Sequence, residues 1–325
     1  MRWEELFLDH GRLRPSWRFF LAVVMIVFTY LAVGIILGMA FGLFHAQPQH
    51  LIFWANCLML AALLALFKIL TSLFEDAPLG SIGLAFSGRW KTELGIGLSL
   101  GVAMILVLAA LEWSLGLAHF SWNLISAERA LASGAYNYLL FAVAATNEEI
   151  TFRGYPFQRL VEAIGPAGAV AILSISFGLL HLQNPSHTWL STLNTIAIGI
   201  SFSVAYLRSR SLWLPIGMHF AWNFSLGYGL GLPVSGILFS NTLLHASVNG
   251  PVWLTGGDYG PEGSWLATGV ILAATIYLLF SPGIYISEEI RRLTFDAPIS
   301  SQAKLVDGVV SPVASSDPHN KVFLA

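Results

Sequence analysis

Charged and imidazole side chains stand within three otherwise apolar stretches of this chain. Glu148 and Glu149 follow the apolar run 139–145, and Arg153 comes one helical turn after Glu149. His181 and His219 lie in two later apolar stretches. Charges at membrane depth cost several kcal/mol unless they are paired or hydrated, so such residues usually serve a function. The combination points to chemistry within a lipid bilayer.

The adjacent acids should direct their carboxylates to different places. Residues four apart share a helix face, whereas adjacent residues point about 100° apart. Glu149 can therefore pair with Arg153, while Glu148 points elsewhere without a local cation. A carboxylate of that kind suits proton abstraction near neutral pH, which makes Glu148 the candidate general base. The plain structural alternative is that both acids only solvate a wet end of the helix.

Each histidine also lies at helical spacing from a second side chain. His181 follows Phe177 by four residues, and Asn223 follows His219 by four. Alone, His181 could be a packed residue with one hydrogen bond, and His219 with Asn223 could be a clamp between membrane helices. Together with Glu148 they supply what peptide hydrolysis requires. The acid takes a proton from water, the imidazoles hold that water, bind a metal or donate to the oxyanion, and the amide donates to the oxyanion.

The composition places the chain in a membrane. Of 325 residues, 56% are hydrophobic and only 10% are charged, against about 25% charged in ordinary soluble domains. A soluble fold cannot bury so much apolar surface, so we predict an all-α, multi-pass integral membrane protein. A net charge of −2 without a basic cluster argues against nucleic acid as a partner. The single cysteine, Cys57, excludes an internal disulfide and a thiolate zinc site.

Apolar stretches of roughly 20 residues predict a bundle of about eight transmembrane helices. They are placed at 19–44, 51–74, 94–117, 135–162, 166–183, 188–207, 211–232 and 264–286. Lys and Arg gather in the even-numbered connections and near both ends of the chain, whereas the odd-numbered connections contain only Arg129. Because positive charge marks cytoplasmic loops, the N and C termini should both be cytoplasmic.

These spans divide the chain into six segments. Residues 1–18 would form a cytoplasmic N-terminal segment, 19–134 the first three helices and their loops, and 135–232 a catalytic core of four helices. The Gly- and Pro-rich connection 233–263 is expected to be an exposed external loop. The last helix would occupy 264–286, and residues 287–325 would form a largely disordered cytoplasmic tail.

Three short motifs carry a resemblance to a known family. They read Glu-Glu-Ile-Thr-Phe-Arg-Gly at 148–154, Phe-Gly-Leu-Leu-His at 177–181 and His-Phe-Ala-Trp-Asn at 219–223. The chain thereby resembles the CPBP family of CAAX prenyl endopeptidases and bacteriocin-processing or immunity proteins, whose pattern is EExxxR, FxxxH and HxxxN. The similarity covers residues 135–232. It implies an intramembrane endopeptidase, which we expect in the inner membrane of a bacterium.

The resemblance also implies a role for each motif residue. Glu148 would be the catalytic base that activates water. His181 and His219 would position that water or ligate a metal, and Asn223 would stabilise the oxyanion. Glu149 and Arg153 would complete the first motif in a supporting role.

The requirement for a metal stays open at this point. The chain has no HExxH, the signature of many soluble zinc proteases. Glu148, His181 and His219 would give a catalytic Zn²⁺ three ligands and one open position. The same residues fit a metal-free mechanism, in which the glutamate takes the proton and the imidazoles hold the water.

The expected partner is a peptide or protein substrate, lipid-modified at its C-terminus if the specificity of eukaryotic members applies. The site should open toward the cytoplasm or the lipid. Two other functions fit the same residues: a non-catalytic immunity or scaffold protein, and a proton-coupled transporter with Glu148 as carrier. Paired broken helices, which mark many transporters, are not evident in the sequence.

Overall fold

The computed structural model describes residues 6–9, 11–44, 48–86 and 88–291. The helices are α2 (Pro15–Phe44), α3 (Pro48–Leu70), α4 (Trp90–Ser114), α5 (Ala127–Arg153), α6 (Tyr155–Leu180), α7 (Trp189–Ser209), α8 (Trp213–Phe224), α9 (Val252–Thr255), α10 (Trp265–Phe280) and α11 (Glu288–Arg291). The strands β1 (Leu8–Asp9) and β2 (Arg12–Leu13) form one small antiparallel sheet, and β3 (Ala118–Trp122) and β4 (Leu244–Val248) form another. Helices dominate the part of the chain described, so the predicted all-α class is confirmed.

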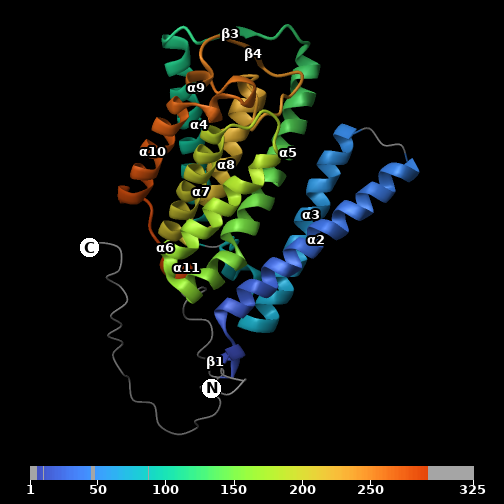
Figure 1. Ribbon diagram of the computed structural model, residues 1–325, viewed down its shortest axis with the longest axis vertical. Helices are drawn as coiled ribbons and strands as arrows, with labels where there is room; N and C mark the ends of the chain where they lie inside the picture. The colour runs from blue at the N-terminus through green and yellow to red at the C-terminus, as the bar shows by residue number, and fades with distance from the viewer. Residues whose placement is uncertain (1–5, 10, 45–47, 87, 292–325) are drawn as a thin grey trace.

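The helices form a bundle beside which α2 and α3 lie as a pair (Figure 1). One apolar core joins α4, α5, α7, α8 and α10, with Met104, Phe141 and Met218 among its buried members. A second core joins α2, α3 and α6, with Leu63, Phe67 and Leu173. The β3–β4 sheet lies at one end of the bundle, and β1 and α11 lie at the other. The two cores meet around α5, α6 and α7, which carry or surround the first two motifs.

The contact between α4 and α8 is unusually close. A Cβ atom on Gly97 would lie 2.2 Å from the carbonyl oxygen of Leu214, and one on Gly101 would lie 2.4 Å from that of Met218. Small residues allow membrane helices to approach backbone to backbone, where van der Waals packing holds them. The third motif lies on α8, so this contact fixes the backbone that carries His219.

Five helical stretches of the described chain are long and apolar enough to cross a membrane. They are Pro15–Ala40, Ile52–Glu75, Trp90–Ser114, Ala127–Gln183 and Trp189–Ser209. The fourth contains both α5 and α6, and α10 is a shorter apolar helix. The stretches indicate an integral membrane protein, whereas the count of about eight spans and the cytoplasmic termini stay predictions.

The predicted span 135–162 is wrong at both ends. Helix α5 begins at Ala127 and ends at Arg153, because Gly154 leaves the helical region (φ −81°, ψ −134°). Residues 155–162 belong to α6, which bends at Gly165 (φ +83°) before Pro166. Proline lacks the N–H that would continue the helical ladder, so the bend falls immediately before it. The bounds of two other predicted spans also change. Helix α2 spans Pro15–Phe44 instead of 19–44, and α10 spans Trp265–Phe280 instead of 264–286.

The connection 233–263 also differs from the expected exposed loop. It contains β4 and α9, and β4 pairs with β3 so that Ala118 lies opposite Val248. Tyr259 and Val234 are buried. A long connection must satisfy its backbone groups, and here the β3–β4 ladder does so in part. Most of the predicted disordered tail, residues 292–325, lies outside the described residues.

Candidate active site

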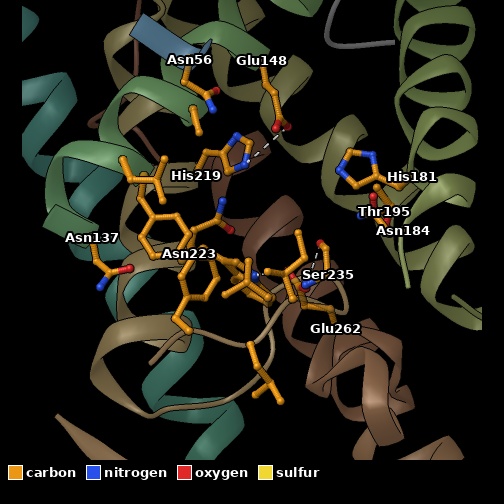
Figure 2. A pocket seen from close by; sticks show the side chains of 18 of the residues that line it. Asn56, Asn137, Glu148, His181, Asn184, Thr195, His219, Asn223, Ser235 and Glu262 are labelled. Atoms are coloured by element: carbon orange, nitrogen blue, oxygen red, sulfur yellow. Dashed lines mark hydrogen bonds and ion pairs between the residues drawn. The ribbon is translucent and has the colours of Figure 1, made fainter. Parts of the chain in front are cut away.

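The four residues expected to do chemistry line one cavity of about 710 Å³. Glu148 comes from α5, His181 from the turn after α6, and His219 and Asn223 from α8. Figure 2 shows Glu148 and His219 facing each other and Asn223 close to His219 on the same side of the cavity. The fold therefore brings the three motifs to one space within the bundle.

Glu149 orients the imidazole of His219. Its Oε1 atom lies 2.9 Å from Nδ1 of His219 and 3.4 Å from Nη1 of Arg153. The carboxylate is fully buried, so both contacts are shielded from water. A carboxylate accepts hydrogen bonds, so Nδ1 carries the proton and donates it, which leaves Nε2 of the neutral ring as an acceptor. The expected ion pair between Glu149 and Arg153 is confirmed.

Arg153 is held on every side. Its Nη2 donates to the carbonyl oxygen of Gly199 at 2.8 Å, and its Nε donates to Ser203 Oγ at 3.4 Å. The guanidinium carbon lies 4.8 Å from the centroid of the Phe177 ring, a cation–π contact. A buried charge is tolerated when it is paired and hydrogen-bonded, and Arg153 meets both conditions. It thus fixes Glu149, and through Glu149 the ring of His219.

Glu148 points into the cavity, away from Arg153. Its Oε2 atom lies 3.8 Å from Nε2 of His219 and has no hydrogen-bond partner among the described residues. The side chain as a whole keeps 35% of its surface exposed, although Oε2 itself is closed to solvent. A separation of 3.8 Å is too long for a direct hydrogen bond. It leaves the two groups close enough to act on one water molecule.

His181 lines the cavity without reaching the other two groups. Its Nδ1 lies 2.8 Å from the carbonyl oxygen of Phe177, and its ring centroid lies 4.6 Å from that of the Phe177 ring. Figure 2 shows His181 apart from the pair formed by Glu148 and His219. The backbone bond assigns the proton to Nδ1 in the neutral ring and leaves Nε2 available to a ligand.

The predicted zinc ligands do not converge. Among the described residues there is no group of three or more His, Cys, Asp or Glu side chains arranged to hold a metal ion. A catalytic zinc needs three protein ligands at about 2.0–2.2 Å. Glu148, His181 and His219 share a cavity, but in this geometry they do not form such a set.

Aromatic residues shape the site beyond what the motifs predicted. The Phe202 ring stacks on that of His219 with centroids 4.9 Å apart and an angle of 19°. Phe177 touches His181 on one side and Arg153 on another. The four-residue spacing of the second motif therefore places its phenylalanine between the charges of the first motif and its own histidine. Phe202 gave no signal, because an aromatic residue in an apolar helix is most often packing.

Glu262 is a site residue that the sequence did not reveal. It comes from the connection 233–263 and lines the same cavity. Its Oε1 accepts a hydrogen bond from Nε1 of Trp222 at 2.8 Å, and its Oε2 accepts from the backbone N–H of Ser235 and, at 3.0 Å, from its hydroxyl. Burial raises the pKa of Glu262, although these hydrogen bonds oppose the rise. The residue ties the connection to α8 next to Asn223.

The cavity also extends toward the β3–β4 end of the bundle. Residues 234–241 of the connection form part of its wall, and Ser133 near the start of α5 donates to the carbonyl oxygen of Asn241 at 2.6 Å. We call residues 234–241 the covering segment. It lies on the side that the charge pattern assigns to the exterior, whereas the sequence predicted an opening toward the cytoplasm or lipid.

Comparison with known proteins agrees with the motifs. Residues 132–225 match the family model described as type II CAAX prenyl endopeptidase Rce1-like. No curated protein and no solved structure matches the chain significantly. The matched range runs from α5 to the end of α8 and contains every residue of the three motifs. Residues 132–225 therefore form an Rce1-like domain, which confirms the resemblance to the CPBP family of CAAX prenyl endopeptidases.

Proposed function

We propose that this protein is an intramembrane endopeptidase that hydrolyses a peptide bond with water activated by Glu148. The observation that carries the proposal is the facing pair of Glu148 and His219, with Oε2 and Nε2 separated by 3.8 Å in a cavity within a helical bundle. The Rce1-like match supports peptide hydrolysis as the reaction class. The protein would act in the inner membrane of a bacterium on a peptide or protein substrate.

The reaction begins with water between Glu148 and His219. The carboxylate takes one proton while Nε2 accepts a hydrogen bond from the other, and the oxygen attacks the carbonyl carbon of the substrate. Glu148 then passes the proton to the leaving nitrogen as the C–N bond breaks. The second proton of the water, left on the new carboxyl group, then moves to the released amine. The products are a carboxylate and an ammonium ion, so atoms and charge balance.

The oxyanion needs donors that are already in position. The side-chain amide of Asn223 lies one helical turn beyond His219 on the same cavity wall, and we assign it as a donor to the oxyanion. His181 lines the cavity with its Nε2 available, so in the protonated ring it is a second donor. Glu149 and Arg153 do not touch the reacting atoms, and they act as positioning residues.

The proposed mechanism uses no metal step. Zinc ligation would require His181 to approach Glu148 and His219, and the described geometry does not bring the three side chains together. The chemistry assigned to Glu148, His219 and Asn223 is complete without that movement.

The test is a Glu148→Gln variant in lipid nanodiscs, assayed by mass spectrometry against a library of apolar peptides. Cleavage should fall by about 10²–10⁴-fold, because the amide cannot take the proton. Thermal unfolding should stay near that of the wild type, because Oε2 has no hydrogen bond to lose. Glu128→Gln, which removes an exposed acid from the first turn of the same helix, is the matched control.

Two outcomes would favour the other functions. If Glu148→Gln unfolds at a lower temperature and the wild type shows no turnover, the protein is a scaffold or immunity protein, in which the polar cluster holds helices together. Uptake driven by a pH gradient in liposomes, without proteolysis, would indicate a transporter. Unchanged cleavage by Glu148→Gln would remove Glu148 as the base.

A further inference from the structure

Helix α3 contributes a side-chain amide to the cavity. Asn56 stands in an apolar stretch of this helix and lines the cavity together with Ile52. Its side chain is only half-buried, so an occupant of the cavity can reach it. Polar side chains within membrane helices usually face a cavity or the bundle interior and serve a function. Helix α3 precedes the Rce1-like domain, so the three motifs assign no task to Asn56.

Two contacts determine how the amide of Asn56 is turned. Its Oδ1 accepts a hydrogen bond from Nδ2 of Asn147 at 3.3 Å, and its Nδ2 donates to the carbonyl oxygen of Ile52 at 2.9 Å. An amide nitrogen carries two hydrogens. The second N–H of Asn56 therefore has no partner among the described residues, and it is available to a molecule in the cavity.

The backbone of α3 is held at the same position. Nδ2 of Asn147 also donates to the backbone carbonyl oxygen of Asn56 at 2.9 Å. Asn147 is buried and directly precedes Glu148, so this bond joins α3 to α5 beside the proposed base. A donor that is already fixed needs no reorganisation when charge develops during a reaction, which is the condition for stabilising an oxyanion.

Asn56 lies next to the pair formed by Glu148 and His219. Figure 2 shows Asn56 beside Glu148 and places His219 between Asn56 and Asn223, whereas His181 lies apart. A carbonyl group attacked by water from between Glu148 and His219 would thus meet an amide from α3 as well as the amide of Asn223 from α8.

We infer that Asn56 is a catalytic residue whose side-chain N–H donates to the carbonyl oxygen of the scissile peptide bond. The plain alternative is that Asn56 only bonds to a carbonyl of its own helix, as asparagine often does. That bond occupies one of the two hydrogens and leaves the other at the cavity. The inference rests on the proposed peptidase function, but donation to a bound carbonyl can be measured without cleavage.

The first test is Asn56→Leu in nanodiscs, with a peptide that the wild type cleaves. Leucine has nearly the same shape and no N–H, so it also keeps water from replacing the donor. We expect kcat to fall by about 10²-fold with little change in KM, because the hydrogen bond strengthens as the oxyanion forms. Thermal unfolding should stay near that of the wild type, since the bond from Asn147 to the backbone remains. Asn249→Leu, at an exposed asparagine outside the cavity, is the matched control.

The second test measures the hydrogen bond directly. The probe is an apolar decapeptide in which one central peptide N–H is replaced by CH₂, with an isotope label on the neighbouring carbonyl, so that it cannot be cleaved there. Infrared spectra of the bound probe give the stretching frequency of that carbonyl. The frequency should be higher in Asn56→Leu than in the wild type and Asn249→Leu. The affinity should fall by about two- to tenfold, as expected for one lost hydrogen bond.

The two tests separate this inference from the proposed function. If the wild type cleaves no peptide but the frequency rises in Asn56→Leu, the peptidase function is removed and the donor role of Asn56 stands. If the wild type cleaves and Asn56→Leu changes neither kcat nor the frequency, the reverse holds. A frequency that does not rise, an unchanged kcat in a cleaving protein, or a probe that does not bind the wild type would each overturn the inference. Asn56→Ala gives the same comparison if Asn56→Leu does not fold.

Discussion

Nδ1 of His219 lies 2.9 Å from Oε1 of Glu149, which joins the first and third motifs across the bundle. This contact assigns different tasks to two neighbouring acids. Glu149 is buried against Arg153 and fixes the ring, while Glu148 faces the cavity with one oxygen free of hydrogen bonds. The outward nitrogen of His219, Nε2, is thereby directed at Glu148. These contacts connect the two acids to one imidazole, and substitutions can test each contact separately.

Two substitutions of His219 should separate folding from catalysis. His219→Asn places an amide nitrogen near the position of Nδ1, so it can still donate to Glu149, whereas His219→Gln places its amide near the position of Nε2. We expect the Asn variant to unfold at a temperature close to that of the wild type and the Gln variant to unfold at a lower one. Both should lose cleavage, because neither supplies the imidazole acceptor. Equal stability of the two variants would contradict the role assigned to Glu149.

Glu149→Gln should destabilise the protein strongly. It leaves the fully buried guanidinium of Arg153 without its counter-charge, and breaking a buried pair from one side costs about 3–5 kcal/mol. The measurement is unfolding in a denaturing detergent. The double variant Glu149→Gln, Arg153→Gln should recover part of the loss, because no uncompensated charge remains. Additive losses in this double-mutant cycle would show that the 3.4 Å contact does not couple the two residues.

The sequence predicted those parts of the site that depend on local spacing. Four-residue steps placed Glu149 beside Arg153, turned Glu148 away, and put Asn223 on the same side as His219. The pairing of Glu149 with His219 could not be predicted, because it depends on how α5 packs against α8. Glu262 was missed for another reason: irregular connections have no periodicity, so nothing in the sequence showed that this acid turns inward.

The fold shows the same division between local and distant information. Apolar runs predicted helices and a membrane location, because burial in lipid depends on composition over roughly 20 residues. The end of α5 at Gly154 was not predicted, whereas the bend at Gly165 falls in the short connection, 163–165, expected between the fourth and fifth spans. The fourth span was consequently drawn too far toward the C-terminus.

Chelation distinguishes a metal-dependent mechanism from the metal-free mechanism, because both use Glu148, His181 and His219. Because Glu148, His181 and His219 are not arranged as a metal-binding group, cleavage should persist after treatment with 1,10-phenanthroline and dialysis. Elemental analysis of the purified protein should then find zinc well below one equivalent per chain. Loss of activity on chelation, with recovery on adding Zn²⁺, would show that the three side chains close around a metal in the working enzyme.

Glu262 should make stability depend on pH. Burial raises its pKa above the ordinary value of 4.5, so the folded state holds the proton more tightly than the unfolded state does. The stabilisation is complete below about pH 4.5 and is lost as pH rises through the folded pKa. The melting temperature of the wild type, relative to Glu262→Gln, should therefore fall as pH rises from 4.5. A difference that stays constant or grows would contradict the raised pKa, and Glu128→Gln provides a control for an exposed acid.

The covering segment can be tested through one glycine. Gly236 has a positive φ of 83°, and a Cβ atom there would lie 2.1 Å from the carbonyl oxygen of Pro185 in the turn between α6 and α7. Gly236→Ala should therefore force the covering segment away from this turn. Gly116→Ala is the matched control, because Gly116 also has a positive φ, 69°, but has open space around it. Both variants carry the strain of a left-handed alanine, about 1–2 kcal/mol.

Only Gly236→Ala should lose more stability than the strain of a left-handed alanine explains. Its melting temperature should fall below that of Gly116→Ala, and its KM for peptide should change, because the segment forms part of the cavity wall. The hydrogen bond from the N–H of Gly236 to the carbonyl oxygen of Tyr259, at 2.8 Å, would be strained by the same movement. Identical stability and kinetics in the two variants would mean that the cavity wall tolerates the shift, and the covering segment would then have no part in binding.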